Sequence, residues 1–174
     1  MEQSIHQLTS TPASEKDLWE TPKPLFNNLD NEFNFTLDAC ANPKNALCEF
    51  YFTDKSNALL HEWPVQSGSV FLNPPYSLTA KFLRYAAEQA RRCGVTIVAL
   101  VNANTDTVWF KHATQSANEI RLISGRISFV KPNGKNAGGN TKGQCIIVWR
   151  GKSKTPCNIT MVDRSELMKV TEAL

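Results

Sequence analysis

The stretch SVFLNPPYS at residues 69–77 constrains the fold of this 174-residue chain more than any other segment. The apolar run at residues 69–72 predicts a buried strand, and it ends at two consecutive prolines. Because proline cannot donate to a sheet ladder and disfavours helical backbone in the residue before it, the chain must turn out of the sheet after Leu72. Ligands of open parallel sheets lie beyond the carboxyl ends of the strands. We therefore expect Asn73 at the mouth of a binding crevice, with Tyr76 just beyond it.

The Asn-Pro-Pro-Tyr turn carries groups suited to one kind of chemistry. The side-chain oxygen of Asn73 and the carbonyl oxygen of Pro74 are two acceptors that can grip both hydrogens of a planar aromatic amine. Such a grip localises the nitrogen lone pair, so a methyl donor held in line reacts without a strong base, through positioning and electrostatics. The ring of Tyr76 can stack on a nucleobase, a contact worth roughly 1–3 kcal/mol. An ordinary strand-ending turn is the alternative interpretation.

Apolar spacing predicts an α/β fold with one mostly parallel sheet. Strands are expected at residues 33–40, 47–53, 69–72, 95–101, 119–130 and 144–150, the last of them antiparallel. Helices are expected from a Thr21 cap through Phe33, over residues 78–93, and after a cap at Thr105 or Asp106. A glycine- and lysine-rich loop at residues 131–144 joins the last two strands. We expect a mobile arm at residues 1–17, one domain at 18–150, and a polar tail at 151–174, partly helical.

A second polar residue ends a predicted strand. Asp38 closes the strand at residues 33–40, in the first half of the sheet. At that edge its carboxylate can bind a cationic ammonium group or a ribose, with a simple turn aspartate as the alternative. Only about thirty residues separate Asp38 from Val70, too few for two full strand–helix repeats, so this half of the sheet must be abbreviated.

Charge is distributed unevenly along the chain. Basic and acidic residues number 4 and 10 over residues 1–62, 5 and 2 over 63–118, and 10 and 4 from 119 onward, so these parts carry −6, +3 and +6. The segment between Glu119 and Asp163 contains no acid. It predicts a polyanion-binding face, with a solvated basic surface as the alternative. Its basic residues are Arg121, Arg126, Lys131, Lys135, Lys142, Arg150, Lys152 and Lys154.

Composition argues against several other classes of protein. No apolar run approaches the length of a membrane span, and the N-terminus lacks the pattern of a signal peptide, so we expect a cytoplasmic protein without membrane contact. The five cysteines include no Cys-x-x-Cys pair, and the three histidines form no ligand pattern. We therefore expect neither a disulfide framework nor a bound metal.

Five short motifs, in this order, resemble the phage-type DNA N-6-adenine methyltransferase (Dam) family. They are WETP at residues 19–22, FTLDACA at 35–41, NPPYS at 73–77, TDTxWF at 105–110 and GRIxF at 125–129. The resemblance covers about residues 18–150. It implies a reduced Rossmann-like methyltransferase fold that uses S-adenosylmethionine, with double-stranded DNA as the partner, in the host cytoplasm if the chain is phage-encoded. The methyl acceptor would be the exocyclic 6-amino group of adenine, in a base flipped out of the duplex.

The resemblance also assigns roles to individual residues. Asn73, Pro74 and Tyr76 would be catalytic. The cofactor would be bound by Trp19, Thr21, Pro22, Asp38, Ala39, Ala41, Asn57 and Asn73. The DNA would be bound by Pro75, Ser77, Arg126, Phe129, Lys131, Lys135 and Lys142. For Phe129, a second stacking face for the base and a place in the core are both open.

Two features depart from the family pattern, and other functions stay open. LDACA at residues 37–41 lacks the glycine pair of most Rossmann methyltransferases, and Asn57-Ala58-Leu59 stands where we expect Asp-Gly-Leu in many relatives. The same chemistry on cytosine or on a protein glutamine is one alternative function. A non-catalytic phage DNA-binding protein is another.

Overall fold

One seven-stranded sheet organises the fold, in the order β2-β1-β3-β4-β6-β5-β7. The computed structural model describes residues 17–63, 67–137 and 142–170. The predicted arm at residues 1–17 therefore lies outside the described residues except for Asp17. Two glycines of the predicted loop, Gly138 and Gly139, also lie outside them. The strands are β1 (Phe35–Asp38), β2 (Phe50–Tyr51), β3 (Ser69–Leu72), β4 (Thr96–Asn102), β5 (Glu119–Ser124), β6 (Gln144–Arg150) and β7 (Asn158–Asp163).

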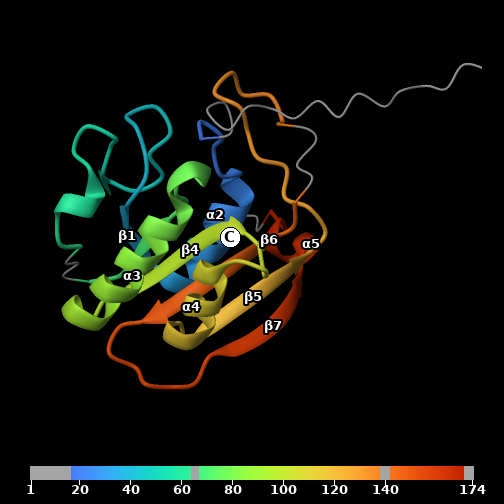
Figure 1. Ribbon diagram of the computed structural model, residues 1–174. Coiled ribbons are helices and arrows are strands. Elements are labelled where there is room, and N and C mark those ends of the chain that lie inside the picture. The colour runs from blue at the N-terminus through green and yellow to red at the C-terminus, as the bar shows by residue number, and fades with distance from the viewer. Residues whose placement is uncertain (1–16, 64–66, 138–141, 171–174) are drawn as a thin grey trace, which may run out of the picture.

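The predicted fold class, a mostly parallel α/β sheet with an antiparallel strand, is confirmed. Neighbouring strands pair in parallel except where β6 meets β4 and β5. Because β6 is reversed, it begins at the edge where β3 and β4 end. Figure 1 shows β4, β6, β5 and β7 side by side across the sheet.

Helices cover both faces of the sheet. The main helices are α2 (Lys23–Phe33), α3 (Thr79–Cys93) and α4 (Val108–Ser116). Along β4, Ile97 and Ala99 belong to the core shared with α3 and α4, whereas Val98 and Leu100 belong to the core shared with α2. This alternation explains why β4 is apolar almost throughout, as expected for a central strand buried on both faces. None of the helices in the described ranges is long and apolar enough to cross a membrane.

Several local features differ from the sequence-based expectation. Thr21 does not cap α2, which begins after Pro22 without a side-chain cap. The cap of α4 is Thr107, whose hydroxyl accepts from the backbone of Phe110. The predicted strand at residues 47–53 is reduced to the two residues of β2. Residues 125–130 form no regular strand, and only Val130 is bridged, to Glu20 and to Asn136.

The sheet extends beyond residue 150, where the sequence suggested a polar tail. β7 pairs in parallel with β5, and the short helix α5 (Arg164–Leu167) follows it. α5 lies against α2, where the Asn28 side chain donates to the Leu167 carbonyl at 2.8 Å. β7 lies at the edge of the sheet and its residues are mostly exposed, although Ile159, Met161 and Val162 make half of it apolar.

Candidate active site

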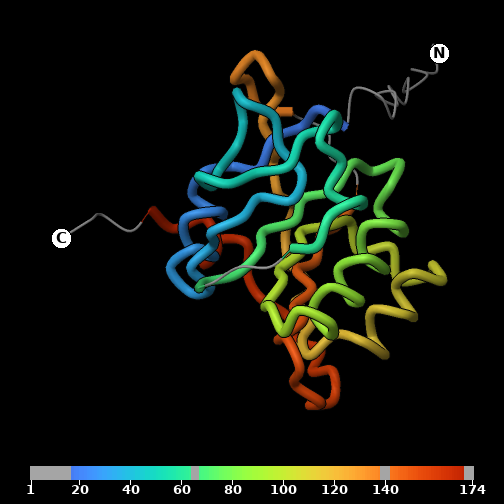
Figure 2. The backbone as a smooth tube through the Cα atoms, turned by 90° about the vertical axis from the view of Figure 1, so that its left-hand side faces the viewer, coloured from blue at the N-terminus to red at the C-terminus, as the bar shows by residue number. Residues whose placement is uncertain are grey.

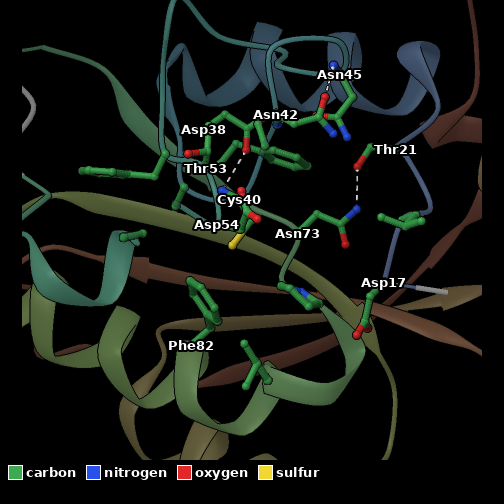
Figure 3. Close-up of a pocket in the computed structure, with 18 of the residues that line it drawn as sticks. Asp17, Thr21, Asp38, Cys40, Asn42, Asn45, Thr53, Asp54, Asn73 and Phe82 are labelled. Atoms are coloured by element: carbon green, nitrogen blue, oxygen red, sulfur yellow. Dashed lines mark hydrogen bonds between the residues drawn. The ribbon is translucent and has the colours of Figure 1, made fainter. Parts of the chain in front are cut away.

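A cavity of about 580 Å³ opens at the carboxyl ends of β1 and β3. This volume lies within the range of small-molecule sites in proteins. Its walls come from residues 17–21, from the residues after β1, from the loop at 52–59, and from the turn after β3 with the start of α3. Figure 3 shows side chains from these segments pointing toward one another across the cavity. The placement agrees with the rule that predicted a crevice at Asn73.

The amide of Asn73 is held by a neighbour from the N-terminal segment. Its Nδ2 donates to the Thr21 Oγ1 at 2.9 Å (Figure 3). Within the described residues the Asn73 Oδ1 and the Pro74 carbonyl oxygen accept no hydrogen bond. Both acceptors expected for an aromatic amine therefore lack a partner in the described residues; Asn73 lines the cavity, whereas Pro74 is buried and does not line it. Thr21, which local sequence suggested as a helix cap, contributes its hydroxyl to the site instead.

Tyr76 packs beside the cavity rather than lining it. Its ring meets Trp19 edge to face, with centroids 6.3 Å apart and an interplanar angle of 87°. Burial, and then the nearby Asp17 carboxylate, raise the pKa of Tyr76 to about 12, so the phenol stays protonated at neutral pH. The Asp17 carboxylate also accepts from the Ser77 hydroxyl at 2.8 Å and from its backbone nitrogen at 3.3 Å.

Asp38 is a buried carboxylate without a basic partner. Its side chain accepts from the backbone nitrogens of Cys40 at 3.2 Å and Leu47 at 3.3 Å, and only 3% of the residue is exposed. Burial raises the pKa of Asp38 from 3.8 to about 6, against the two hydrogen bonds that lower it. No Lys or Arg of the described ranges pairs with it. A cation bound in the cavity would relieve this cost of burial.

Most of the residues assigned to cofactor binding do line the cavity. Trp19, Thr21, Asp38, Ala39, Ala41, Asn57 and Asn73 are among its walls, whereas Pro22 is buried outside them. Asn57 has a left-handed backbone with φ of 47°, and its side chain accepts from the Leu59 nitrogen. The side-chain oxygen of Asn57 is therefore bonded within its own loop, and its side-chain NH2 group is left to face a ligand.

Sequence reasoning missed several residues of the walls. Asp17, Cys40, Asn42, Asn45, Thr53, Asp54, Lys81 and Phe82 also line the cavity. Asp54 follows β2, so the strand-end rule that selected Asp38 and Asn73 was also a signal for it. Burial and the neighbouring Asp38 raise the pKa of the Cys40 thiol, which keeps it protonated and unreactive.

The residues assigned to DNA binding fall into three groups. Pro75 and Ser77 line the cavity. Arg126, Lys135 and Lys142 are exposed, and Lys131 is half-buried, on the segments between β5 and β6 outside the cavity. Phe129 is 3% exposed and stacks on Trp19 at 6.4 Å, so the structure assigns it to the core rather than to a base-stacking face.

The basic segment predicted as one DNA-binding face is divided by the fold. Arg121 and Arg150 pair with Glu32 and Glu119, and both guanidinium groups lie 5.4 Å from the ring of Phe33. They therefore stabilise the packing of α2 on the sheet and do not form part of a free basic surface.

Two further lysines of that segment lie at the opposite edge of the sheet. Lys152 and Lys154 follow the end of β6, and the Lys152 side chain lies against Gly94 at the start of β4. The residues 129–137, here called the basic hairpin, lie at the edge where β3 and β4 end. Figures 1 and 2 show the hairpin in orange and the loop after β6 in red-orange at opposite ends of the molecule.

Acidic, cysteine and histidine side chains do not gather into a metal site in the described part of the chain, where no group of three or more could hold an ion.

The cavity offers the buried carboxylate of Asp38, the amide oxygen of Asn73 and aromatic walls. These groups suit a cationic, partly aromatic ligand and a second, amine-bearing ring.

Comparisons with known proteins agree with the motifs. A family model described as DNA N-6-adenine-methyltransferase (Dam) matches residues 8–174. The chain is 34% identical over 159 residues to the DNA N-6-adenine-methyltransferase of Escherichia phage T1, a match covering 82% of this chain and 66% of that protein. It is 33% identical over 149 residues to the DNA N-6-adenine-methyltransferase of Haemophilus phage HP1, covering 83% and 85%.

A third relative is shorter. The putative methyltransferase YfdM of Escherichia coli strain K12 is 36% identical over 83 residues, which cover 42% of this chain and 91% of that protein. The family model spans nearly all of the chain, and the resemblance drawn from five motifs is confirmed. The chain belongs to the DNA N-6-adenine-methyltransferase (Dam) family.

Proposed function

We propose that this chain transfers a methyl group from S-adenosylmethionine to the 6-amino group of adenine in double-stranded DNA. The observation that carries the proposal is the Asn73 amide, which is tied to Thr21 through its nitrogen and leaves its oxygen available at the cavity. The names of the phage T1 and phage HP1 relatives support adenine in DNA as the acceptor. The match spans 66% of the phage T1 protein, so the activity of that whole protein enters here only as part of the proposal.

The residues of the cavity fit S-adenosylmethionine, which when bound supplies an electrophilic methyl group on a sulfonium. Asp38 would hold the cofactor's positive ammonium group, because its buried carboxylate lacks a cationic partner in the described residues. Asp54, exposed at the end of β2, would accept from the ribose hydroxyls. The ring of Phe82 and the residues near Asn57 would contact the adenine of the cofactor.

The turn after β3 would hold the acceptor base. The Asn73 Oδ1 and the Pro74 carbonyl would each accept one hydrogen of the adenine amine, which leaves the nitrogen lone pair directed at the methyl group. An amine inside a duplex cannot reach this turn, so the base must leave the stack at a cost of a few kcal/mol. Stacking on Tyr76 would offset part of that cost, about 1–3 kcal/mol.

The direct test is transfer of tritium from labelled S-adenosylmethionine to unmethylated duplex DNA, followed by digestion to nucleosides. Label in N6-methyl-2′-deoxyadenosine is the expected result. Label in cytosine would identify the cytosine amine as the acceptor. Label in added protein but not in DNA would indicate a protein substrate with glutamine as the acceptor. Cofactor binding without any transfer would indicate a DNA-binding protein that has lost turnover.

We further propose that the basic hairpin and its flanks contact DNA phosphates through Arg126, Lys131, Lys135 and Lys142. These four follow β5 or precede β6, so they share the edge of the sheet where Asn73 lies. Lys142 also donates to Asn104, in the segment after β4, at 3.4 Å. Phosphate contacts of this kind fix the register of a protein on DNA without reading its sequence.

The division of the basic segment predicts an unequal response to charge removal. The double variant Lys131→Ala/Lys135→Ala should lower the slope of log affinity against log salt by about two, roughly one for each phosphate contact. The double variant Lys152→Ala/Lys154→Ala removes the same charge from the opposite edge and should leave the slope unchanged. Fluorescence anisotropy of labelled duplex at several salt concentrations measures both. Equal losses in the two variants would refute the assignment.

A further inference from the structure

The segment at residues 17–21 contacts the catalytic turn through alternate side chains. Asp17 accepts from the backbone nitrogen and the hydroxyl of Ser77 through its two carboxylate oxygens. Thr21 accepts from the Asn73 amide nitrogen (Figure 3). Trp19, between them, meets Tyr76 edge to face. These three contacts come from five consecutive residues, so one short segment reaches three positions of the turn. We call residues 17–21 the support segment.

The support segment is itself held by the basic hairpin. Glu20 and Val130 exchange both backbone hydrogen bonds, at 2.8 and 3.0 Å. Trp19 stacks on Phe129 with an interplanar angle of 27°. Val130 is also bridged to Asn136 within the hairpin. The support segment is therefore fixed on one side by the hairpin and presents its other contacts to the turn.

The contact of Thr21 with Asn73 bears on the chemistry, because an amide has two different ends. The oxygen of Asn73 can accept a hydrogen from an adenine amine, whereas its NH2 group would face that amine donor to donor. Thr21 is 7% exposed, and its hydroxyl oxygen accepts from the Asn73 Nδ2 at 2.9 Å. Without that acceptor a half-buried NH2 group would lack a partner, and the orientation with oxygen toward the amine would lose its support.

We infer that Thr21 is a positioning residue: its hydroxyl holds the Asn73 amide nitrogen so that the amide oxygen faces the adenine amine. This inference rests on the proposed function, and it adds a role to a residue otherwise assigned to the cofactor pocket. A residue that served only the cofactor would change cofactor affinity. A positioning residue changes turnover at saturating cofactor, because it acts on the amide that grips the acceptor.

The test compares Thr21→Val, which keeps the shape and removes the hydroxyl, with Thr21→Ser, which keeps the hydroxyl. Thr21→Val should lower kcat by about 100-fold, the effect of a misplaced catalytic group, with the Kd for S-adenosylmethionine unchanged. Thr21→Ser should restore kcat. Thr114→Val is the matched control, because within the described residues the Thr114 hydroxyl bonds only the Lys111 carbonyl on α4, away from the cavity. Its kcat should equal that of wild type.

A second measurement does not depend on turnover. In wild type, NMR should show slowed exchange of one Asn73 side-chain amide proton, assigned by its absence in Asn73→Ser. Thr21→Val should lose this protection. Protection in wild type together with a Ser-rescued loss of kcat supports the inference. An unprotected amide, an unchanged kcat in Thr21→Val, or a change in cofactor Kd alone would overturn it. If wild type protects the amide but methylates nothing, the proposed function fails while the contact stands.

Discussion

Replacing Asn73 with alanine is expected to lower kcat for adenine methylation by at least about 100- to 1000-fold, the effect of removing one preorganised group that acts on the reacting atoms. Alanine removes the oxygen that would accept an amine hydrogen and leaves the Pro74 carbonyl as the remaining acceptor. The amine nitrogen then stays planar, with its lone pair delocalised into the ring. Single-turnover transfer of labelled methyl to duplex DNA measures the effect on the chemical step.

The matched control is Asn31→Ala, which replaces an exposed asparagine on α2 and should leave kcat unchanged. The Asn73 variant must also keep the fold, checked by its thermal transition, because its amide has only the Thr21 partner in the described residues. Wild-type turnover in a folded Asn73→Ala protein would remove the turn from the mechanism. A loss of cofactor affinity without a loss of kcat would assign Asn73 to the cofactor alone.

Replacing Asp38 with asparagine is expected to weaken S-adenosylmethionine binding by about 30-fold or more. This follows from a loss of about 2 kcal/mol or more when one partner of a buried charge pair is removed. Calorimetric titration of wild type and variant gives the comparison. Asp106→Asn, an exposed aspartate in the turn after β4, is the control and should bind the cofactor as wild type does. Equal affinities for Asp38→Asn and wild type would exclude the carboxylate as the ammonium site.

The raised pKa of Asp38 also predicts how pH acts on the ligand-free protein. Its pKa is about 6 in the folded state and 3.8 in its ordinary setting, so between these values the unfolded chain has already lost a proton that the folded chain keeps. Unfolding free energy should therefore decrease as pH rises from about 4 to 6, by up to about 3 kcal/mol from this group. Asp38→Asn should abolish that decrease, as urea unfolding at pH 4 to 7 would show.

Deprotonation of Asp38, which lowers the stability of the ligand-free protein, should raise its affinity for the cofactor. A cation beside Asp38 lowers the pKa again, because it favours the charged carboxylate. Cofactor affinity should therefore increase as pH rises through about 6 and level off above it. In Asp38→Asn this pH dependence should disappear. An affinity that does not change between pH 5 and 7 in wild type would argue that another group meets the ammonium.

The parts of the site that sequence predicted are those encoded by neighbouring residues. Asp38 and Asn73 each end a short apolar run, and the rule that ligands lie beyond parallel strands placed both at one edge without any knowledge of the pairing. The periodicity of α3 and the continuous apolar run of β4 likewise predicted these elements within one or two residues. In each case local pattern and tertiary environment favour the same structure.

The parts that sequence could not predict depend on partners far along the chain. Thr21 before a proline has the local pattern of a helix cap, and nothing nearby indicates that Asn73, 52 positions later, takes its hydroxyl. Arg121 resembles any other basic residue of its segment until Glu32, 89 positions away, is placed beside it. β7 is a different case, because its sequence NITMVD contains three apolar residues, a strand signal that sequence reasoning overlooked in a segment that is otherwise polar.

The support segment has a consequence for how the protein matures during synthesis. The chain emerges from its N-terminal end, so residues 17–21 are made long before the hairpin that holds them through Val130. α2, which follows directly, also waits for a late partner, because Asn28 binds the carbonyl of Leu167, 139 positions later. Contacts over such separations form slowly, because the entropy cost of closing the long loop comes before the contact stabilises the chain. We therefore expect the nascent chain to acquire β1, β3 and the turn first, and a competent amide only after residues 129–137 have been made.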